Sequence, residues 1–392
     1  MKVFEINTGF ISGGPPRVMN GVCDALINRG DDCMVAASRG EMRKDIKSVR
    51  VGGKFSPYVN ALSARLFDNV GFTAKRATKK LIKEIKAYDP DVIHLHNLHG
   101  YYLDIEVLFD YLKSANKKVI WTLHDCWAFT GHCAHFDYAN CYKWETGGCE
   151  NCPQKKEYPK SIFLNRSKKN FARKKRAFTG VKDLTIVTPS NWLKNLVERS
   201  FLKDYKVVTV YNGIDLDKFK PIKSDILKRY GLENKKILLG VANVWTKKKG
   251  FKDFIKLAEV LPDDYKIVLI GVTEKQIKTL PANILGLRRT GSIQELCEWY
   301  TAADKFLNLS YEETMGLVTV EALACGTAVI VYDRTAVPEV IDKTCGIVVK
   351  AGDINSILKV VAENKFKSED CIKRAYSFDK TLKYREYLEL FN

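Results

Sequence analysis

Two glutamates in the last third of the chain, Glu313 and Glu321, have a spacing that suits a ligand site. They stand eight residues apart, which brings them to nearly one side of a helix with 3.6 residues per turn. The surrounding pattern predicts a strand at 305–309, a helix at 317–324 and a second strand at 328–332. Backbone amides at the start of such a helix offer an anion site. Two solvent-facing charges are the alternative reading.

Histidines follow two predicted strands in the first half of the chain. His94, His96 and His99 lie in and after a buried strand at 92–95, and His124 with Asp125 ends the next strand. Ligands of open α/β sheets bind outside the carboxyl ends of strands, so both groups stand in the right place for a site. Surface or core histidines are the alternative.

Four cysteines fall within twenty residues, with the spacing C-x7-C-x7-C-x2-C: Cys133, Cys141, Cys149 and Cys152. In a cytosolic chain such a cluster favours metal over disulfides. Four thiolates could close a tetrahedral structural zinc site that staples a Gly-rich insertion at 126–160. Because four Cys ligands leave no open position, we do not expect a catalytic zinc. Free thiols or a partial disulfide are the alternative, and Cys23, Cys297 and Cys325 read as core residues.

The composition fits a globular enzyme with a basic surface. A length of 392 residues suits two domains. No apolar run approaches the ~20 residues that span a bilayer, and the N-terminus reads as a strand rather than a signal peptide, so we expect a cytoplasmic protein. The net charge of +18 suits nucleic acid, an anionic membrane or a polyphosphate substrate. The run Lys155–Arg176 predicts a basic amphipathic helix for an anionic membrane surface, with a solvated charged face as the alternative.

Alternating strands and helices over residues 1–215 indicate a Rossmann-like half. Its first loop contains Gly13 and Gly14, where a backbone could approach a ligand, but it lacks the G-x-G-x-x-G fingerprint of dinucleotide sites. A second half begins beyond Asp215. In it, three lysines precede a helix expected from Gly250, so that ammonium groups and amides could hold a diphosphate. A solvated lysine run is the alternative.

The glutamate pair, followed by ALACGTAVIV and Val337-Pro338-Glu339, resembles the E-x7-E element of retaining family 4 glycosyltransferases. The strings HLHNLHGYYLDIEVL, TLHDCWAFTGHC and CPQKKEYPKS resemble a bacterial branch that assembles capsule, colanic-acid-type or O-antigen polysaccharide, and the likeness covers nearly the whole chain. The resemblance implies an α/β GT-B fold, with two Rossmann-like parallel-sheet domains facing a central cleft. The acceptor domain would comprise residues 1–215 and a C-terminal crossover helix at 377–392, and the donor domain residues 216–376.

The resemblance also implies roles for single residues. Glu313 would lie against the donor sugar, with His124 as a sugar contact and Asp125 as its companion in catalysis. Glu321 would take the ribose hydroxyls. The remaining donor-binding candidates are residues of loops and helix starts: Gly14, Asn243, Lys249, Arg289, Met315, Gly316, Leu317 and Val318. Val244 stands where many family members have an Arg, which removes one phosphate contact.

The implied activity is a hexosyltransferase reaction without a catalytic cofactor. It would move a sugar, with retention, from a UDP- or GDP-sugar to a hydroxyl of a polyprenyl-diphosphate-linked oligosaccharide. The enzyme would lie peripherally on the inner face of the cell membrane. One alternative is a non-hydrolysing sugar-nucleotide epimerase of the same fold. A nucleic-acid-binding protein is another, but it would leave the glutamate pair unexplained, and nucleic acid is not expected as a partner.

Overall fold

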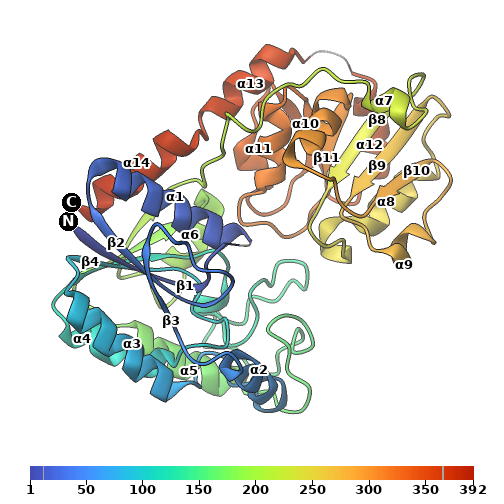
Figure 1. The fold of residues 1–392 in the computed structure, drawn as a ribbon. Coiled ribbons are helices and arrows are strands. Elements are labelled where there is room, and N and C mark those ends of the chain that lie inside the picture. Colours follow the sequence, from blue (N-terminus) through green and yellow to red (C-terminus); the bar gives the residue numbers. More distant parts are fainter. Residues whose placement is uncertain (12, 364–365) are drawn as a thin grey trace. The chain divides into compact units, whose positions relative to one another are not determined.

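The computed structural model describes residues 1–11, 13–363 and 366–392 and divides into two compact units (Figure 1). Unit 1 comprises Met1–Tyr211 and Lys383–Asn392, and unit 2 comprises Asn212–Leu382. The domain boundaries expected from the sequence lie at 215/216 and 376/377, so the structure assigns the short segments 212–215 and 377–382 to unit 2 rather than to unit 1. Among the helices of the described residues, none is long and apolar enough to cross a membrane.

Unit 1 is built on a seven-stranded parallel sheet with the order β3-β2-β1-β4-β5-β6-β7. Its strands are β1 Lys2–Gly9, β2 Asp32–Arg39, β3 Lys47–Arg50, β4 Val92–Leu95, β5 Lys118–Thr122, β6 Leu184–Thr188 and β7 Lys206–Thr209. The central strands are nearly continuous runs of buried residues, as expected when helices cover both faces of a parallel sheet. The strand predicted at 92–95 is confirmed as β4.

Two apolar clusters flank this sheet. The helices are α1 Gly14–Arg29, α2 Ser56–Phe67, α3 Lys75–Tyr88, α4 Ile105–Ser114, α5 Ser167–Phe178, α6 Asn191–Glu198 and α14 Lys380–Phe391, with a 3₁₀ turn η1 at Trp127–Phe129. Residues of α1 and the end of α14 form one cluster, and residues of α3, α4, α5 and α6 form the other. Side-chain caps fix two helix starts, since Asp104 accepts from the Val107 amide and Ser190 from the Leu193 amide.

Unit 2 is built on a six-stranded parallel sheet with the order β10-β9-β8-β11-β12-β13. Its strands are β8 Lys236–Val241, β9 Tyr265–Ile270, β10 Ile284–Leu287, β11 Lys305–Asn308, β12 Val329–Tyr332 and β13 Gly346–Val349. The helices are α7 Ile226–Arg229, α8 Phe251–Ala258, α9 Glu274–Ile277, α10 Ile293–Ala302, α11 Leu317–Ala324, α12 Ile354–Val361 and α13 Ser368–Tyr376, with 3₁₀ turns η2 Lys247–Lys249 and η3 Val337–Val340. The strand-helix-strand unit predicted around the glutamate pair is confirmed as β11, α11 and β12.

The Cys-rich insertion at 126–160 contains η1 and otherwise irregular chain within the described residues. Trp144 packs on Phe129 and Phe136, and His132 Nδ1 lies 2.6 Å from Asp68 Oδ1. The insertion is therefore held by an aromatic cluster and a buried polar pair.

The four thiols of this insertion do not form a compact ligand set. Cys149 Sγ accepts from the Gly131 amide at 3.1 Å, and contact with Cys133 lowers the pKa of Cys152 to about 6. Among the described residues, the one group with at least three ligand atoms within 4.8 Å of one another is Glu5, His94 and His96. The thiols as placed therefore do not fit a four-cysteine zinc site, and structural zinc stays a prediction. Cys23, Cys297 and Cys325 are buried, as predicted.

The basic amphipathic helix predicted within Lys155–Arg176 forms as α5, but its apolar side is not free. Phe178 is fully buried, and Phe171 packs against the same core. Phe163 and Leu164 precede the helix and are exposed. The apolar face of α5 therefore stabilises unit 1 and is covered by it.

Candidate active site

In unit 1 the carboxyl ends of β4 and β5 lie side by side, because the two strands are parallel neighbours. The loops that follow them line a small pocket. His96 and His99 come from the first loop, and His124 and Asp125 from the second. The topology thus brings together residues that are separated by about 28 positions in the sequence.

His124 is an uncharged hydrogen-bonding group. Its Nε2 lies 3.0 Å from His96 Nδ1, and the two rings stack with centroids 5.3 Å apart. Burial lowers the pKa of His124 to about 3, although the neighbouring Asp125 opposes this shift. At neutral pH the ring therefore carries no positive charge, and it can accept a hydrogen bond from a ligand hydroxyl or donate one to it.

Asp125 is directed to a different histidine. Its Oδ2 lies 2.9 Å from His99 Nε2, while its Oδ1 accepts from the Trp127 amide at 2.9 Å. Burial would raise the pKa of Asp125, but His99 outweighs it and the pKa is about 2. His99 Nδ1 in turn lies 3.1 Å from the Tyr158 hydroxyl. The expected companion of His124 is thus the orienting partner of His99, and sequence reasoning did not identify Tyr158.

In unit 2 two ion pairs connect η2 to the loop after β11. Lys248 Nζ lies 2.8 Å from Glu312 Oε2, and Lys249 Nζ pairs with Glu313 Oε1. The backbone joins the same segments, because the Tyr311 amide donates to the Lys248 carbonyl at 2.8 Å. The sequence assigned Lys249 and Glu313 to separate contacts, and the structure pairs them directly.

The start of α11 follows these pairs immediately. Gly316 is its N-cap, with φ 83°, a left-handed conformation that favours glycine. Asn308 at the end of β11 donates to Thr319 Oγ1 at 2.9 Å and so fixes the first turn of α11 to the sheet. Met315 is buried, while Leu317 and Val318 are half-buried. The amides of this turn can bind an anion.

Glu321 lies on the next turns of α11 and is only 5% exposed. The Tyr300 hydroxyl donates to its Oε2 at 3.0 Å. Tyr300 belongs to α10 and was not among the predicted site residues, since a buried tyrosine in an apolar helix reads as core. The contact holds the Glu321 carboxylate in one orientation.

The other predicted donor-site residues lie on exposed backbone. Gly14 begins α1, Asn243 follows β8 and Arg289 follows β10. In unit 2, Asn243 and Arg289 thus follow strand ends, the edge where ligands of such sheets bind.

Two family models match the chain. The model of Glycosyltransferase Family 4 matches residues 12–218, more than half of the chain, and that of Glycosyl transferases group 1 matches residues 235–363.

Curated relatives carry glycosyltransferase names. The putative colanic acid biosynthesis glycosyl transferase WcaC of Escherichia coli (strain K12) is 25% identical over 279 residues, which cover 69% of this chain and 67% of that protein. The N,N'-diacetylbacillosaminyl-diphospho-undecaprenol alpha-1,3-N-acetylgalactosaminyltransferase of Campylobacter jejuni is 27% identical over 210 residues, 49% of this chain and 55% of that protein. The matched stretches thus span from about half to two thirds of these relatives.

Solved structures share the fold over the whole chain. Sucrose-phosphate synthase from Thermosynechococcus elongatus has a TM-score of 0.72 at 16% identity and covers 100% of this chain and 98% of its own. Anabaena HepE in complex with UDP has a TM-score of 0.68 at 14% identity, with coverage of 100% and 99%. The predicted GT-B class, two parallel-sheet α/β domains, is confirmed. With the family match over more than half of its length, this chain is a glycosyltransferase and belongs to Glycosyltransferase Family 4.

Proposed function

We propose that this enzyme transfers a sugar, with retention, from a UDP- or GDP-sugar to a hydroxyl of a polyprenyl-diphosphate-linked oligosaccharide during synthesis of a bacterial surface polysaccharide. One observation carries the donor assignment: in unit 2 the ion pair of Lys249 and Glu313 lies directly before the start of α11, and the buried Glu321 lies on that helix. UDP in the HepE structure supports a nucleotide donor. The names of the WcaC and Campylobacter relatives support the pathway and the lipid-linked acceptor.

The leaving group of this reaction is a nucleoside diphosphate, which needs positive potential. Lys249 and the amides from Gly316 to Val318 would supply it without a metal ion, since the first amides of a helix have no partner within the helix and no side chain caps the start of α11. The Glu321 carboxylate, oriented by Tyr300, would accept hydrogen bonds from the ribose hydroxyls.

The sugar itself develops positive charge in the transition state. Glu313 would stabilise that charge, and His124 would contact a sugar hydroxyl as a neutral ring. We do not assign Glu313 as a covalent nucleophile. Attack on the same face, assisted by the departing phosphate, matches the retention of configuration.

The test is a calorimetric titration with UDP, GDP, ADP and their sugar conjugates on wild type, Glu321→Gln and a matched control. Glu198→Gln on α6 is the control, because Glu198 is a half-exposed surface glutamate of unit 1. One nucleotide should bind selectively, and Glu321→Gln should weaken it by about 1.5–3 kcal/mol, the typical contribution of a hydrogen bond to a charged group. Equal affinity in wild type and Glu321→Gln, or no binding at millimolar nucleotide, would refute the donor site.

We also propose peripheral attachment to an anionic membrane surface through the run Lys155–Arg176 together with α2. Five large side chains are exposed, the N-cap residue Phe55 and, on α2 itself, Tyr58, Val59, Leu62 and Phe67. The exposed Ile162 and Phe163 belong to the basic run, and the Ile162 amide donates to the Arg65 carbonyl of α2 at 2.7 Å. Apolar side chains beside lysines suit the interface of a membrane with anionic lipids.

Vesicle flotation tests this attachment. Wild type should float with vesicles that contain anionic lipid, less so as salt increases, and Phe55→Ser with Phe163→Ser should remove most of the binding. Tyr376→Ser, an exposed aromatic residue of unit 2, is the matched control. Unchanged flotation of the double variant would refute this surface.

A further inference from the structure

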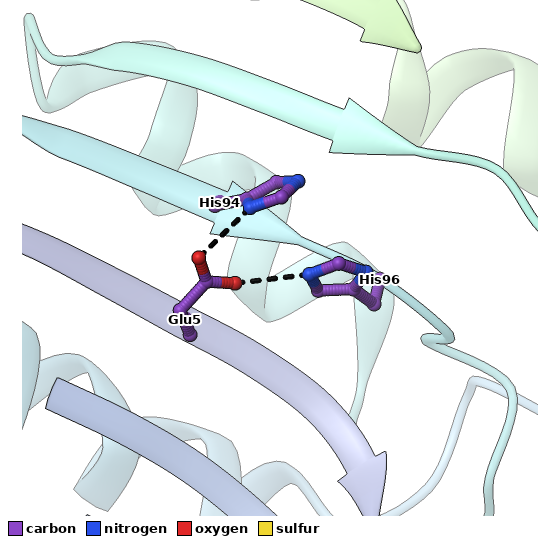
Figure 2. A group of neighbouring side chains, drawn as sticks. All are labelled: Glu5, His94 and His96. Carbon is purple, nitrogen blue, oxygen red and sulfur yellow. Dashed lines mark hydrogen bonds and ion pairs between the residues drawn. The ribbon is translucent and has the colours of Figure 1, made fainter. Parts of the chain in front are cut away.

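A buried acid lies between two histidines in the middle of the unit 1 sheet. Glu5 of β1 pairs in register with His94 of β4, and His96 stands two residues further on, directly after the end of β4. Because side chains alternate between the faces of a strand, all three lie on one face (Figure 2). Glu5 and His94 are 0% exposed and His96 is 1% exposed. Burying such groups is unfavourable unless they are hydrogen-bonded.

These residues belong to a continuous hydrogen-bonded chain. Glu5 Oε1 lies 2.9 Å from His94 Nδ1, and Glu5 Oε2 lies 2.9 Å from His96 Nε2. On one side His94 Nε2 lies 2.8 Å from Thr122 Oγ1, which is 3.4 Å from the Tyr387 hydroxyl. On the other side His96 Nδ1 lies 3.0 Å from His124 Nε2. The chain thus runs from α14 to the pocket histidine.

The direction of the protons follows from the middle of this chain. An ionised Glu5 has no proton to donate, so the histidine nitrogen that faces each of its oxygens must carry the proton. His94 then carries its proton on Nδ1, directed at Glu5, and its Nε2 is left as an acceptor beside Thr122 Oγ1. Burial lowers the pKa of His94 and of His96 to about 3, so each ring carries a single proton.

We propose that Glu5 is a positioning residue: its carboxylate accepts from both histidines and, through His96, holds the proton of His124 on Nε2. A His96 proton directed at Glu5 leaves His96 Nδ1 as an acceptor. That acceptor requires a donor at 3.0 Å, which is the Nε2–H of His124. His124 Nδ1 then carries a lone pair, and the ring lines the pocket. The side chain at the pocket is thereby an acceptor for a ligand hydroxyl.

The same three residues offer ligand atoms for a metal ion. However, both oxygens of Glu5 and all four ring nitrogens of His94 and His96 already have hydrogen-bond partners in this network. No atom of the group therefore needs a metal ion to be satisfied, and the hydrogen-bonded chain explains the arrangement completely.

The consequence for a sugar hydroxyl rests on the proposed function, whereas the proton positions do not. Two-bond ¹H–¹⁵N correlation spectra report which ring nitrogen is protonated, and the chain has only six histidines to assign. In wild type we expect the proton on Nδ1 of His94 and on Nε2 of both His96 and His124. A proton on Nδ1 of either His96 or His124 would overturn the proposal, whatever group the enzyme transfers.

Glu5→Gln tests the role of Glu5 itself, since the amide offers one acceptor and one donor in place of two acceptors. Exactly one of His94 and His96 should reverse its tautomer, and His124 should reverse if and only if His96 does. Tyr387→Phe is the matched control, because it removes only the far hydroxyl and should leave His96 and His124 unchanged. No reversal in Glu5→Gln would overturn the proposal, as would a stoichiometric metal ion whose removal shifts the His94 and His96 signals.

Discussion

The buried histidines of unit 1 should make the protein sensitive to mild acid. Burial lowers the pKa of His94 and of His96 to about 3 in the folded chain, against about 6.5 in the unfolded chain. The unfolded state therefore binds more protons between these values. The stability that the neutral histidines contribute is complete above pH 6.5 and is lost as the pH falls toward 3.

The size of the effect follows from the linkage relation. For a histidine with a pKa of about 6.5 in the unfolded state and near 3 in the folded state, lowering the pH from 7 to 5.5 reduces the free energy of unfolding by about 1.3 kcal/mol. Glu5 acts in the opposite direction, because burial raises its pKa. A difference between variants isolates the histidine contribution, provided that both variants retain Glu5.

The assay is urea unfolding at pH 7 and pH 5.5, followed by tryptophan fluorescence, because four of the six tryptophans lie in unit 1. The acid-induced loss should be about 1.3 kcal/mol smaller in His94→Gln than in wild type. Thr122→Val removes the neighbour of His94 without removing a titrating group, so it should lower stability equally at both pH values. An identical acid-induced loss in wild type and His94→Gln would refute the neutral, buried state of His94.

Three further changes test how backbone and charge hold the site. Gly250→Ala should lower the melting temperature and the activity, and calorimetry should show a loss of at least about 1–2 kcal/mol in the free energy of unfolding. The reason is that φ is 74° and a Cβ would lie 2.3 Å from the Leu309 carbonyl oxygen. In the control Gly53→Ala the added Cβ meets no atom within 4 Å, so stability and activity should not change. Lys249→Met should lower kcat by about 10²–10³, as loss of one transition-state donor does, while nucleoside affinity stays within twofold; an equal loss in the exposed Lys247→Met would contradict a specific role. Gly21→Ala should destabilise unit 1 by about 1–3 kcal/mol in urea, since a Cβ would overlap the Tyr384 ring; wild-type stability in that variant would show that α14 does not pack there.

Strand and helix positions near the site were predictable because they depend on local pattern. Buried apolar runs at 92–95 and 305–309 followed by polar loops indicate parallel strands with functional ends, and they form β4 and β11. The helix at 317–324 was predicted with its observed bounds, since Gly316 and Gly326 enclose it. Pattern therefore identified the edges of both sheets that carry candidate residues.

The pairing of side chains was not predictable in the same way. Asp125 stands beside His124 in the chain but contacts His99, because the turn at Trp127 uses one of its oxygens and directs the other away. Tyr300 joins Glu321 from a helix whose other residues read as core. Likewise, α5 has the charge pattern of a membrane helix, yet its phenylalanines are needed for the core. Such choices depend on packing between segments distant in sequence.

The candidate site residues include neutral rings in unit 1 and charged side chains in unit 2, and this difference bears on the proposed reaction. In unit 1 burial keeps the pKa of His96 and of His124 near 3, so these two pocket rings are neutral and can recognise hydroxyls without attracting phosphate. In unit 2 Lys249 is paired with Glu313, and neither is fully buried. On the proposed function, a donor phosphate competes with Glu313 for Lys249. Phosphate binding would then release the Glu313 carboxylate when the sugar beside it develops positive charge. A partly exposed ion pair suits this exchange, because breaking a fully buried pair would leave an uncompensated charge in the core.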